Sequence, residues 1–558
     1  MRHCGFTFLF SCVLVASASS QQSTPAPSTS AAPPKAPSAA TQSQKPEKTP
    51  VEAAAEKAAE TSRLADKDHD YSQESFVVEQ MHSHYRFEAD GTGRKEVIAR
   101  IRVQSEAGVQ QWGQLQVGYN SANERVEIPY VRVLKEDGTV IKAGDDAVQD
   151  LSAPVEHEAP VYTDYRQKHI TVPGLRPGEV LEYDLVTVIH TPLAAGQFWT
   201  EYEFDKSNIV LDEQVDVDVP SNRALKLKNK PGHDPNITEA NGRRVYHWSS
   251  SHLEREDDDK NKDKEKDKKK KKHRPDDDRP DIQMTTFETW EQIGRWYASL
   301  ERDRRKPSPE VRAKAEELTK GLTTDLDKTE ALYDFVAKNF RYVSLSLGVG
   351  RYQPHASSDV LHNQYGDCKD KHTLLASMLE AEGLHASSVL INSSRKLDPD
   401  VPSPSQFDHV ITMLPMGKEE VWMDTTAEVG PFRLLAFQLR KKQALVIPPM
   451  DPPSPIAPHL EETPADTPMP DTEFSQIDGK INDIGKLEAH VNYSFRGDEE
   501  LLLRSVFRRV PQANWQRVVE NVNASLGGDI TNLKVSDPAA TREPFTLSYD
   551  VSKVNFLD

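Results

Sequence analysis

Cysteine is scarce in this chain, with only three among 558 residues. Cys4 and Cys12 lie in an N-terminal segment that has the features of a cleavable signal peptide. Removal of that segment leaves Cys368 without a partner, which excludes an intrachain disulfide, although an exported chain could have used one. An unpaired thiol in an exported protein needs an explanation, and a chemical role is one.

Long apolar runs are also lacking beyond the N-terminus. A basic start precedes the apolar stretch from Gly5 to Ala16, and Ala16-Ser17-Ala18 is typical of a cleavage site. We therefore predict a signal peptide at residues 1–18 and an exported protein, either periplasmic or secreted. No later run approaches the roughly 18 to 20 apolar residues of a membrane span, which predicts a soluble mature chain.

A lipid anchor has little support in the same segment. Leu9-Phe10-Ser11-Cys12 is faintly similar to a lipoprotein box, but Phe10 fits that motif poorly and apolar residues continue beyond Cys12. The sequence alone does not decide between a free and a lipid-anchored form.

Positive charge is in deficit, because the formal net charge is -19. That balance argues against a general nucleic-acid binder, and the chain has no phosphate-cradling glycine motif. The HExxH and CxxC spacings of metal sites are missing, so a metalloenzyme built on nearby histidines is disfavoured. We expect no metal and no cofactor. The histidines considered for a metal site were His82, His84, His157, His169, His190, His355, His362, His372 and His385.

The length predicts about three to four domains of roughly 100 to 200 residues each. The low hydrophobic share, 36%, reflects two segments that cannot build a core: a Pro/Ser/Ala-rich linker at 19–68 and a charged linker at 251–282. Lys268 to Lys272 would suit a polyanion, but flanking aspartates offset them, which favours a solvated linker.

Residues 69–250 show the pattern of a β-rich domain. Short alternating runs such as Val97 to Val103 and Val180 to Val188 predict strands, and turn signals such as Pro173-Gly174 separate them. Their spacing predicts an antiparallel β-sandwich-like fold without a catalytic constellation.

Helical periodicity begins in the next segment, residues 283–450. Trp290, Ile293, Trp296, Tyr297 and Leu300 share one face of a helix, and we interpret this stripe as core. A second helix should begin at Pro309 with Ser308 as its cap and end near Gly321, and a third should begin near Asp327.

Cys368 lies at the expected start of another helix. Asp367 can cap that helix, Asp370 is its capping-box partner, and Gly383 ends it. The helix dipole and the free amides of the first turn favour a negatively charged sulfur, and the amides could also hold an oxyanion.

His409 and Asp424 lie on two predicted strands, His409 to Leu414 and Val421 to Asp424, joined by a short turn. In such a hairpin the carboxylate of Asp424 can orient the imidazole while the imidazole faces Cys368. Asp408 competes for that role, but its side chain should point to the opposite face of the strand.

These segments resemble bacterial transglutaminase-like proteins of the papain-like cysteine superfamily. The resemblance rests on Gly366 to Lys371, Phe407-Asp408-His409, Trp422 to Thr426, and the preceding Arg341-Tyr342-Val343 and Gln353-Pro354-His355. It implies a central transglutaminase-like α+β domain after a β-rich domain of unknown function, with Cys368 as nucleophile, His409 as general base and acid, and Asp424 as orienting residue. Asp408 departs from the pattern, since relatives often carry Asn there.

The resulting hypothesis is an exported cysteine acyltransferase or hydrolase that acts on amide bonds of a protein or peptide, with a cell-envelope peptide as one candidate. Hydrolysis is slightly favoured over transamidation, because water is always available. The alternative is a catalytically silent, envelope-associated binding or assembly module. The oligomeric state and the ligand of the β-rich domain stay open, and the Pro- and Ser-rich loop from Ser393 to Gln406 is a candidate lid.

A Pro-rich connector at 451–470 leads to a β-rich C-terminal module at 471–558. Strand patterns at Leu487 to Tyr493 and Thr546 to Val551 enclose a helix near Gln512 to Val522. The chain stops soon after a strand, which leaves open whether the module is complete. The predicted fold class is therefore multidomain α+β.

Overall fold

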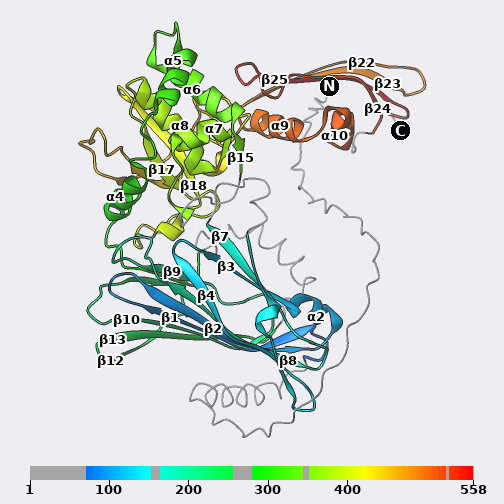
Figure 1. Cartoon of the computed structure of the whole chain (residues 1–558). Helices are drawn as coiled ribbons and strands as arrows, with labels where there is room; N and C mark the ends of the chain where they lie inside the picture. The colour runs from blue at the N-terminus through cyan, green and yellow to red at the C-terminus, as the bar shows by residue number, and fades with distance from the viewer. Residues whose placement is uncertain (1–70, 153–163, 255–278, 344–350, 523–526, 557–558) are drawn as a thin grey trace, which may run out of the picture.

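The computed structural model describes residues 71–152, 164–254, 279–343, 351–522 and 527–556. The predicted signal peptide, the linker at 19–68 and most of the charged linker, including Lys268 to Lys272, lie outside these residues. Three parts follow one another along the chain: a β-rich part, an α+β part and a C-terminal sheet with two helices (Figure 1). This arrangement confirms the predicted multidomain α+β fold class. None of the helices within the described residues is long and apolar enough to span a membrane.

The N-terminal part is built on an eight-stranded sheet in the order β12-β13-β10-β1-β2-β8-β4-β5. Alternating apolar residues make it half-buried: in β10, Val215, Val217 and Val219 face the core while the residues between them carry charge. Its strands are β1 (Phe76–Phe87), β2 (Gly93–Val103), β4 (Glu124–Leu134), β5 (Val140–Lys142), β8 (Val180–Ile189), β10 (Val210–Pro220), β12 (Asn236–Ala240) and β13 (Arg243–His252).

Two three-stranded sheets pack against the apolar face of this large sheet, one over each half, and give a sandwich-like core. All pairings are antiparallel except the central one, where β1 runs parallel to β10. The short helix α2 (Glu106–Trp112) packs beside β2. The two small sheets consist of β3 (Gln114–Asn120), β6 (Val148–Ser152) and β7 (Tyr165–Thr171), and of β9 (Trp199–Tyr202), β11 (Lys226–Asn229) and β14 (Ile282–Thr285).

Strand β14 lies across the predicted boundary between the charged linker and the central domain. It pairs with β9 and β11 of the N-terminal part, so residues 283–285 extend the β-rich part rather than the central one. Asp281 is fully buried, where it accepts a hydrogen bond from the Phe204 amide and pairs with Lys206 and Lys230. The C-terminal end of the predicted charged linker, residues 279–282, is therefore part of the folded β-rich part despite the charged composition of 251–282.

The central part places helices on one face of the five-stranded antiparallel sheet β19-β18-β17-β20-β21. Its strands are β17 (Ser387–Ile391), β18 (His409–Met416), β19 (Glu419–Met423), β20 (Gln443–Ile447) and β21 (His459–Glu462). Its helices are α4 (Trp290–Glu301), α5 (Pro309–Thr319), α6 (Asp325–Asn339), α7 (Ser357–Asn363) and α8 (Cys368–Ala381).

The helix starts follow from capping residues. Ser308 caps α5 with Pro309 at the first position, as predicted. Helix α6 begins two residues before the predicted start, because Thr324 caps it by accepting a hydrogen bond from the Asp327 amide. Strand β21 lies within the predicted Pro-rich connector and pairs with β20. This strand was not predicted, because it has only four residues and prolines lie close to it in the sequence.

The C-terminal part is a four-stranded antiparallel sheet in the order β22-β23-β25-β24, with α9 and α10 on one face (Figure 1). The predicted strands and helix are present, whereas β22, β24 and α9 had not been anticipated. The elements are β22 (Thr472–Ile481), β23 (Leu487–Arg496), α9 (Asp498–Arg509), α10 (Trp515–Val522), β24 (Asp529–Val535) and β25 (Phe545–Lys553).

Candidate active site

Cys368 is the first residue of α8. The Asp367 side chain accepts a hydrogen bond from the Asp370 amide, and Asp370 returns the bond to the Asp367 amide, which completes the predicted capping box. The short parallel pair β15 (Arg341–Tyr342) and β16 (Tyr365–Gly366) sets Tyr342 opposite Gly366, two residues before the sulfur. The partly exposed thiol thus occupies the electropositive first turn of a buried helix.

His409 and Asp424 are brought together at one end of the β18–β19 hairpin. Met413 pairs with Trp422, and counting in steps of two from that pair puts His409 and Asp424 on the same face. His409 Nε2 lies 3.1 Å from Asp424 Oδ2. The carboxylate is held by Thr426, whose amide and hydroxyl donate to Asp424 Oδ1 at 2.9 and 2.7 Å.

Burial and charge act in opposite directions on this pair. Burial alone lowers the pKa of His409, but the negative charge of Asp424, the hydrogen bond to Asp424 and the nearby Cys368 sulfur outweigh burial and raise that pKa well above its ordinary value. Burial raises the pKa of Asp424, but the His409 cation and the Thr426 hydrogen bonds lower it by more. The net effect is a pKa below the ordinary value of an aspartate. The site therefore stabilises a histidine cation beside a carboxylate.

Cys368 and His409 line the same cavity, and the sulfur is one of the groups that raise the pKa of His409. Because Nε2 faces Asp424, Nδ1 is the ring nitrogen left for the sulfur. Asp408 does not bind His409. Its carboxylate instead accepts hydrogen bonds from the amide and hydroxyl of Ser393 at 2.7 and 2.9 Å. The structure thus assembles Cys368, His409 and Asp424 and turns Asp408 away.

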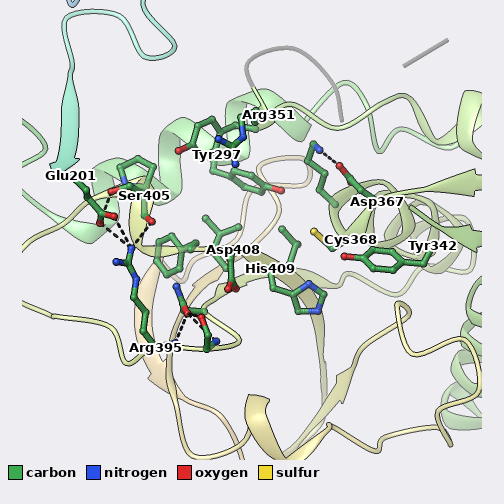
Figure 2. A pocket seen from close by; sticks show the side chains of 18 residues that line it. Glu201, Tyr297, Tyr342, Arg351, Asp367, Cys368, Arg395, Ser405, Asp408 and His409 are labelled. Carbon is green, nitrogen blue, oxygen red and sulfur yellow. Dashed lines mark hydrogen bonds and ion pairs between the residues drawn. The ribbon is translucent and has the colours of Figure 1, made fainter. Parts of the chain in front are cut away.

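A cavity of about 620 Å³ opens beside the sulfur (Figure 2). Cys368 and His409 lie at one wall, with the aromatic rings of Tyr297, Tyr342 and Phe407 nearby. That volume is ample for a few residues of a peptide.

The cavity extends to the N-terminal part of the chain. Glu201 of β9 lines it together with Arg395, and Arg395 Nη2 donates to the two Glu201 carboxylate oxygens at 3.0 and 2.9 Å. Ser405 Oγ donates to the same carboxylate at 2.9 Å (Figure 2). The β-rich part therefore contributes Glu201 to the lining of the cavity.

The candidate lid, from Ser393 to Gln406, lines the cavity and is bound to the N-terminal part. Besides the Arg395 pair, Asp398 pairs with Lys228 at 3.1 Å and with Arg279 at 2.9 Å. The indole of Trp290 donates to the carbonyl of Pro399. Several polar contacts, each from a different side chain, hold this loop in place.

The histidines that had been considered for a metal site are dispersed. His355 Nδ1 contacts Asp370 at 3.1 Å, which fixes the capping carboxylate, and His372 is buried between Thr412 and Ser388. No group of three or more His, Cys, Asp or Glu side chains in the described ranges could hold a metal ion. His157 lies outside those ranges.

Several residues that line the cavity were not assigned to the site from the sequence. Tyr297 had been assigned to the core, and it is indeed buried, but it also faces the cavity. Glu201 lies in the β-rich part, where the sequence showed no catalytic pattern, and Arg395 lies in the candidate lid, whose composition marked the loop but not this residue. Tyr342 lies within the Arg341-Tyr342-Val343 motif, which was the available signal.

Comparison with known families agrees with this division of the chain. Residues 89–256 match DUF3857, a domain of unknown function for which a structure has been solved. Residues 312–424 match the transglutaminase-like superfamily. The chain has no match among curated proteins.

Among solved structures, a proposed protease from Parabacteroides distasonis has a similar fold, with a TM-score of 0.56 at 12% identity over 86% of this chain and 93% of that one. A proposed cysteine protease from Cytophaga hutchinsonii has a TM-score of 0.19 at 14% identity over 41% of this chain and 71% of that one. A zinc metallopeptidase of the M1 type from Deinococcus radiodurans has a TM-score of 0.20 at 15% identity over 32% of this chain and 39% of that one. The chain therefore carries a transglutaminase-like core domain preceded by a DUF3857 domain, as its motifs predicted.

Proposed function

We propose that this protein is an exported cysteine hydrolase that cleaves amide bonds of peptides or proteins through a thioester on Cys368. The observation that carries the proposal is the buried pair of His409 and Asp424, 3.1 Å apart, which lies beside Cys368 at the wall of a peptide-sized cavity (Figure 2). The match to the transglutaminase-like superfamily supports the same chemistry.

In the first step, the Cys368 sulfur attacks the carbonyl carbon of the amide, and the electron pair of the C=O bond moves to the oxygen. The tetrahedral intermediate then collapses, the C–N bond breaks, and protonated His409 gives its proton to the departing amine. A thioester and a free amine result. Asp424 stabilises the histidine cation that donates this proton.

In the second step, His409 takes a proton from water as the water oxygen attacks the thioester, and the acid is released with the thiolate restored. An amine in place of water would give transamidation. We favour water because transamidation also needs an amine site and exclusion of water.

The predicted signal peptide at residues 1–18 supports export to the periplasm or the medium, where the substrate would be a peptide or protein of the envelope or surroundings. Fusion of residues 1–18 to a reporter, compared with a reporter lacking them, tests this part of the proposal. Retention of the fused reporter in the cytoplasm would contradict it.

The first test measures alkylation of Cys368 by iodoacetamide in the full chain between pH 5 and 9, with the labelled peptide assigned by mass spectrometry. Because the thiolate is the reacting form, we expect rapid labelling at pH 6.5 that falls roughly tenfold or more in His409→Ala. His459→Ala, in strand β21 away from the cavity, is the matched control and should label at the wild-type rate. Equal labelling of wild type and His409→Ala would instead favour the silent binding module.

The second test incubates the wild type and Cys368→Ala with a synthetic peptide library and the amine dansylcadaverine. Cleaved peptides that appear only with the wild type support hydrolysis. Dansylated peptides without cleavage would replace hydrolysis by transamidation.

A further inference from the structure

We propose that the hydroxyl of Tyr297 donates a hydrogen bond to the carbonyl oxygen of the substrate when that oxygen becomes negatively charged. The inference rests on the proposed function and adds a residue to it that the sequence motifs do not include. Tyr297 comes from α4, outside the residues matched to the transglutaminase-like superfamily.

The hydroxyl of Tyr297 is a buried polar group without a partner. The side chain is only 2% exposed, yet its oxygen makes no hydrogen bond within the described residues. Buried hydroxyls nearly always have a partner, because removing them from water without one costs free energy. A phenylalanine would fill the same space without that cost, so the hydroxyl points to a ligand.

The surroundings show where that ligand would lie. Most of the ring packs among apolar side chains, including Ile293, Leu390 and Leu445. Tyr297 also lines the cavity that holds Cys368, and Cys368 packs against the same apolar cluster. In Figure 2 the Tyr297 ring reaches from α4 into the space above Cys368, with its hydroxyl on the Cys368 side.

The hydroxyl is kept in its donor form. Burial, and then the negative charges of Glu301 and Cys368, raise the pKa of Tyr297 well above its ordinary value. The proton therefore stays on the oxygen throughout the working pH range. A neutral donor in a water-poor pocket is suited to a charge that exists only during the reaction.

The chemistry needs such a donor. When the Cys368 sulfur forms its bond to the carbonyl carbon, the C=O electron pair becomes a full negative charge on oxygen. The amides of Cys368 and Lys369, which precede the capped Asp370 amide, can supply one hydrogen bond from the side of the sulfur. Tyr297 supplies a second from α4, without transferring its proton.

The test uses Tyr297→Phe, which removes only the hydroxyl, and a peptide aldehyde that adds reversibly to a reactive cysteine. The sulfur bonds to the aldehyde carbon, and the aldehyde oxygen takes up the negative charge or a proton, as in the tetrahedral intermediate. Binding is measured by the protection of Cys368 from iodoacetamide. We expect Tyr297→Phe to weaken aldehyde binding roughly 10-fold to 100-fold, by more than any change in the alkylation rate of the free enzyme.

Two further variants keep the test specific. Tyr493→Phe, at a buried tyrosine of the C-terminal sheet, should bind the aldehyde as the wild type does. Tyr342→Phe examines the other tyrosine near the sulfur. A loss of aldehyde binding in Tyr342→Phe but not in Tyr297→Phe would overturn the assignment.

The outcomes separate this inference from the proposed function. If the wild type binds the aldehyde and Tyr297→Phe binds it equally well, the oxyanion role is wrong while the reactive cysteine stands. If the wild type neither binds the aldehyde nor shows His409-dependent alkylation, the proposed function fails first. With a cleaved peptide in hand, Tyr297→Phe should lower kcat roughly 100-fold with little change in KM.

Discussion

His372 lies in the second turn of the helix that carries Cys368, yet it has a structural role. It is 1% exposed, with Nδ1 2.7 Å from Thr412 Oγ1 and Nε2 2.7 Å from Ser388 Oγ. Since the Ser388 hydroxyl donates to Glu301, Nε2 must donate to Ser388 and Nδ1 must accept from Thr412. The ring therefore works as a neutral link between α8, α4 and the sheet.

This arrangement makes stability depend on pH. Burial, with the Arg305 charge as a second cause, lowers the pKa of His372 to about 3. The unfolded chain binds a proton at this group near pH 6.5, whereas the folded chain does not until about pH 3. The contribution is therefore fully favourable above pH 6.5 and is lost as the pH falls towards 3, because the unfolded state then binds more protons.

We accordingly expect His372 to reduce the free energy of unfolding by about 2 kcal/mol between pH 7 and pH 5. In His372→Gln this part of the pH dependence should disappear, although the overall stability falls. Urea unfolding at the two pH values measures both quantities. His459→Gln, at a partly exposed histidine, should keep the wild-type difference, and an unchanged difference in His372→Gln would contradict the argument.

At the scale of the element, the first turn of α8 links helix geometry to the site. Asp367 both caps the helix and pairs with the ammonium of Lys369, and both side chains are buried. Lys371 donates to the carbonyls of Ala337 and Phe340, and burial lowers the pKa of Lys371 to about 8. The two lysines of the Gly366 to Lys371 motif are thus internal ties.

We expect Asp367→Ala to cost roughly 3–5 kcal/mol of unfolding free energy, because it removes a cap and also leaves Lys369 buried without its partner. Ser308→Ala, which removes only the cap of α5, should cost about 1 kcal/mol. Urea unfolding followed by tryptophan fluorescence compares them. Equal losses in the two variants would show that the buried pair adds nothing.

Helix starts were predictable to the extent that a local side chain determines them. Ser308 and Asp367 were identified from sequence because a cap lies within three residues of the amide it binds. Strands β14 and β21 were not, because each is short and is held by partners distant in the chain. Amino-acid composition therefore predicts a short strand poorly when pairing with a distant strand determines whether it forms.

The same distinction separates the parts of the candidate site. Cys368, His409 and Asp424 follow one another within one domain, and their motifs and strand parity predicted their meeting. Tyr297 and Glu201 line the cavity because of tertiary packing, and the spacing of residues along the sequence does not predict such packing.

At the scale of the whole molecule, the DUF3857 domain and the core share one interface. Trp199 and Trp296 pack edge to face with ring centroids 5.6 Å apart, and Tyr352 contacts both rings. The Trp296 indole donates to the carbonyl of Leu193. The ion pair of Glu201 and Arg395 extends this interface to the loop that borders the cavity.

We expect Glu201→Gln to loosen that loop. Trypsin cleavage after Arg395 or Lys396 should accelerate roughly tenfold, the factor that corresponds to about 1.4 kcal/mol of lost pairing. High salt should accelerate cleavage of the wild type in the same direction, because it screens the pair. Peptide mass spectrometry over a time course identifies the cut.

Glu203→Gln is the matched control, because Glu203 is an exposed glutamate just beyond the same strand. It should be cut at the wild-type rate. Identical trypsin rates for wild type and Glu201→Gln would mean that the remaining contacts of Asp398 and Trp290 hold the loop without this pair.

The parallel pairing of β1 with β10 also determines when the N-terminal sheet can be completed during synthesis. Val78 pairs with Val210, so β1 keeps an open edge until β10 has been made and, in an exported chain, has crossed the membrane. Pairings between distant segments form slowly, and open strand edges invite aggregation. A chaperone that shields residues 76–87 would therefore be needed most while the residues between β1 and β10 are still being synthesised.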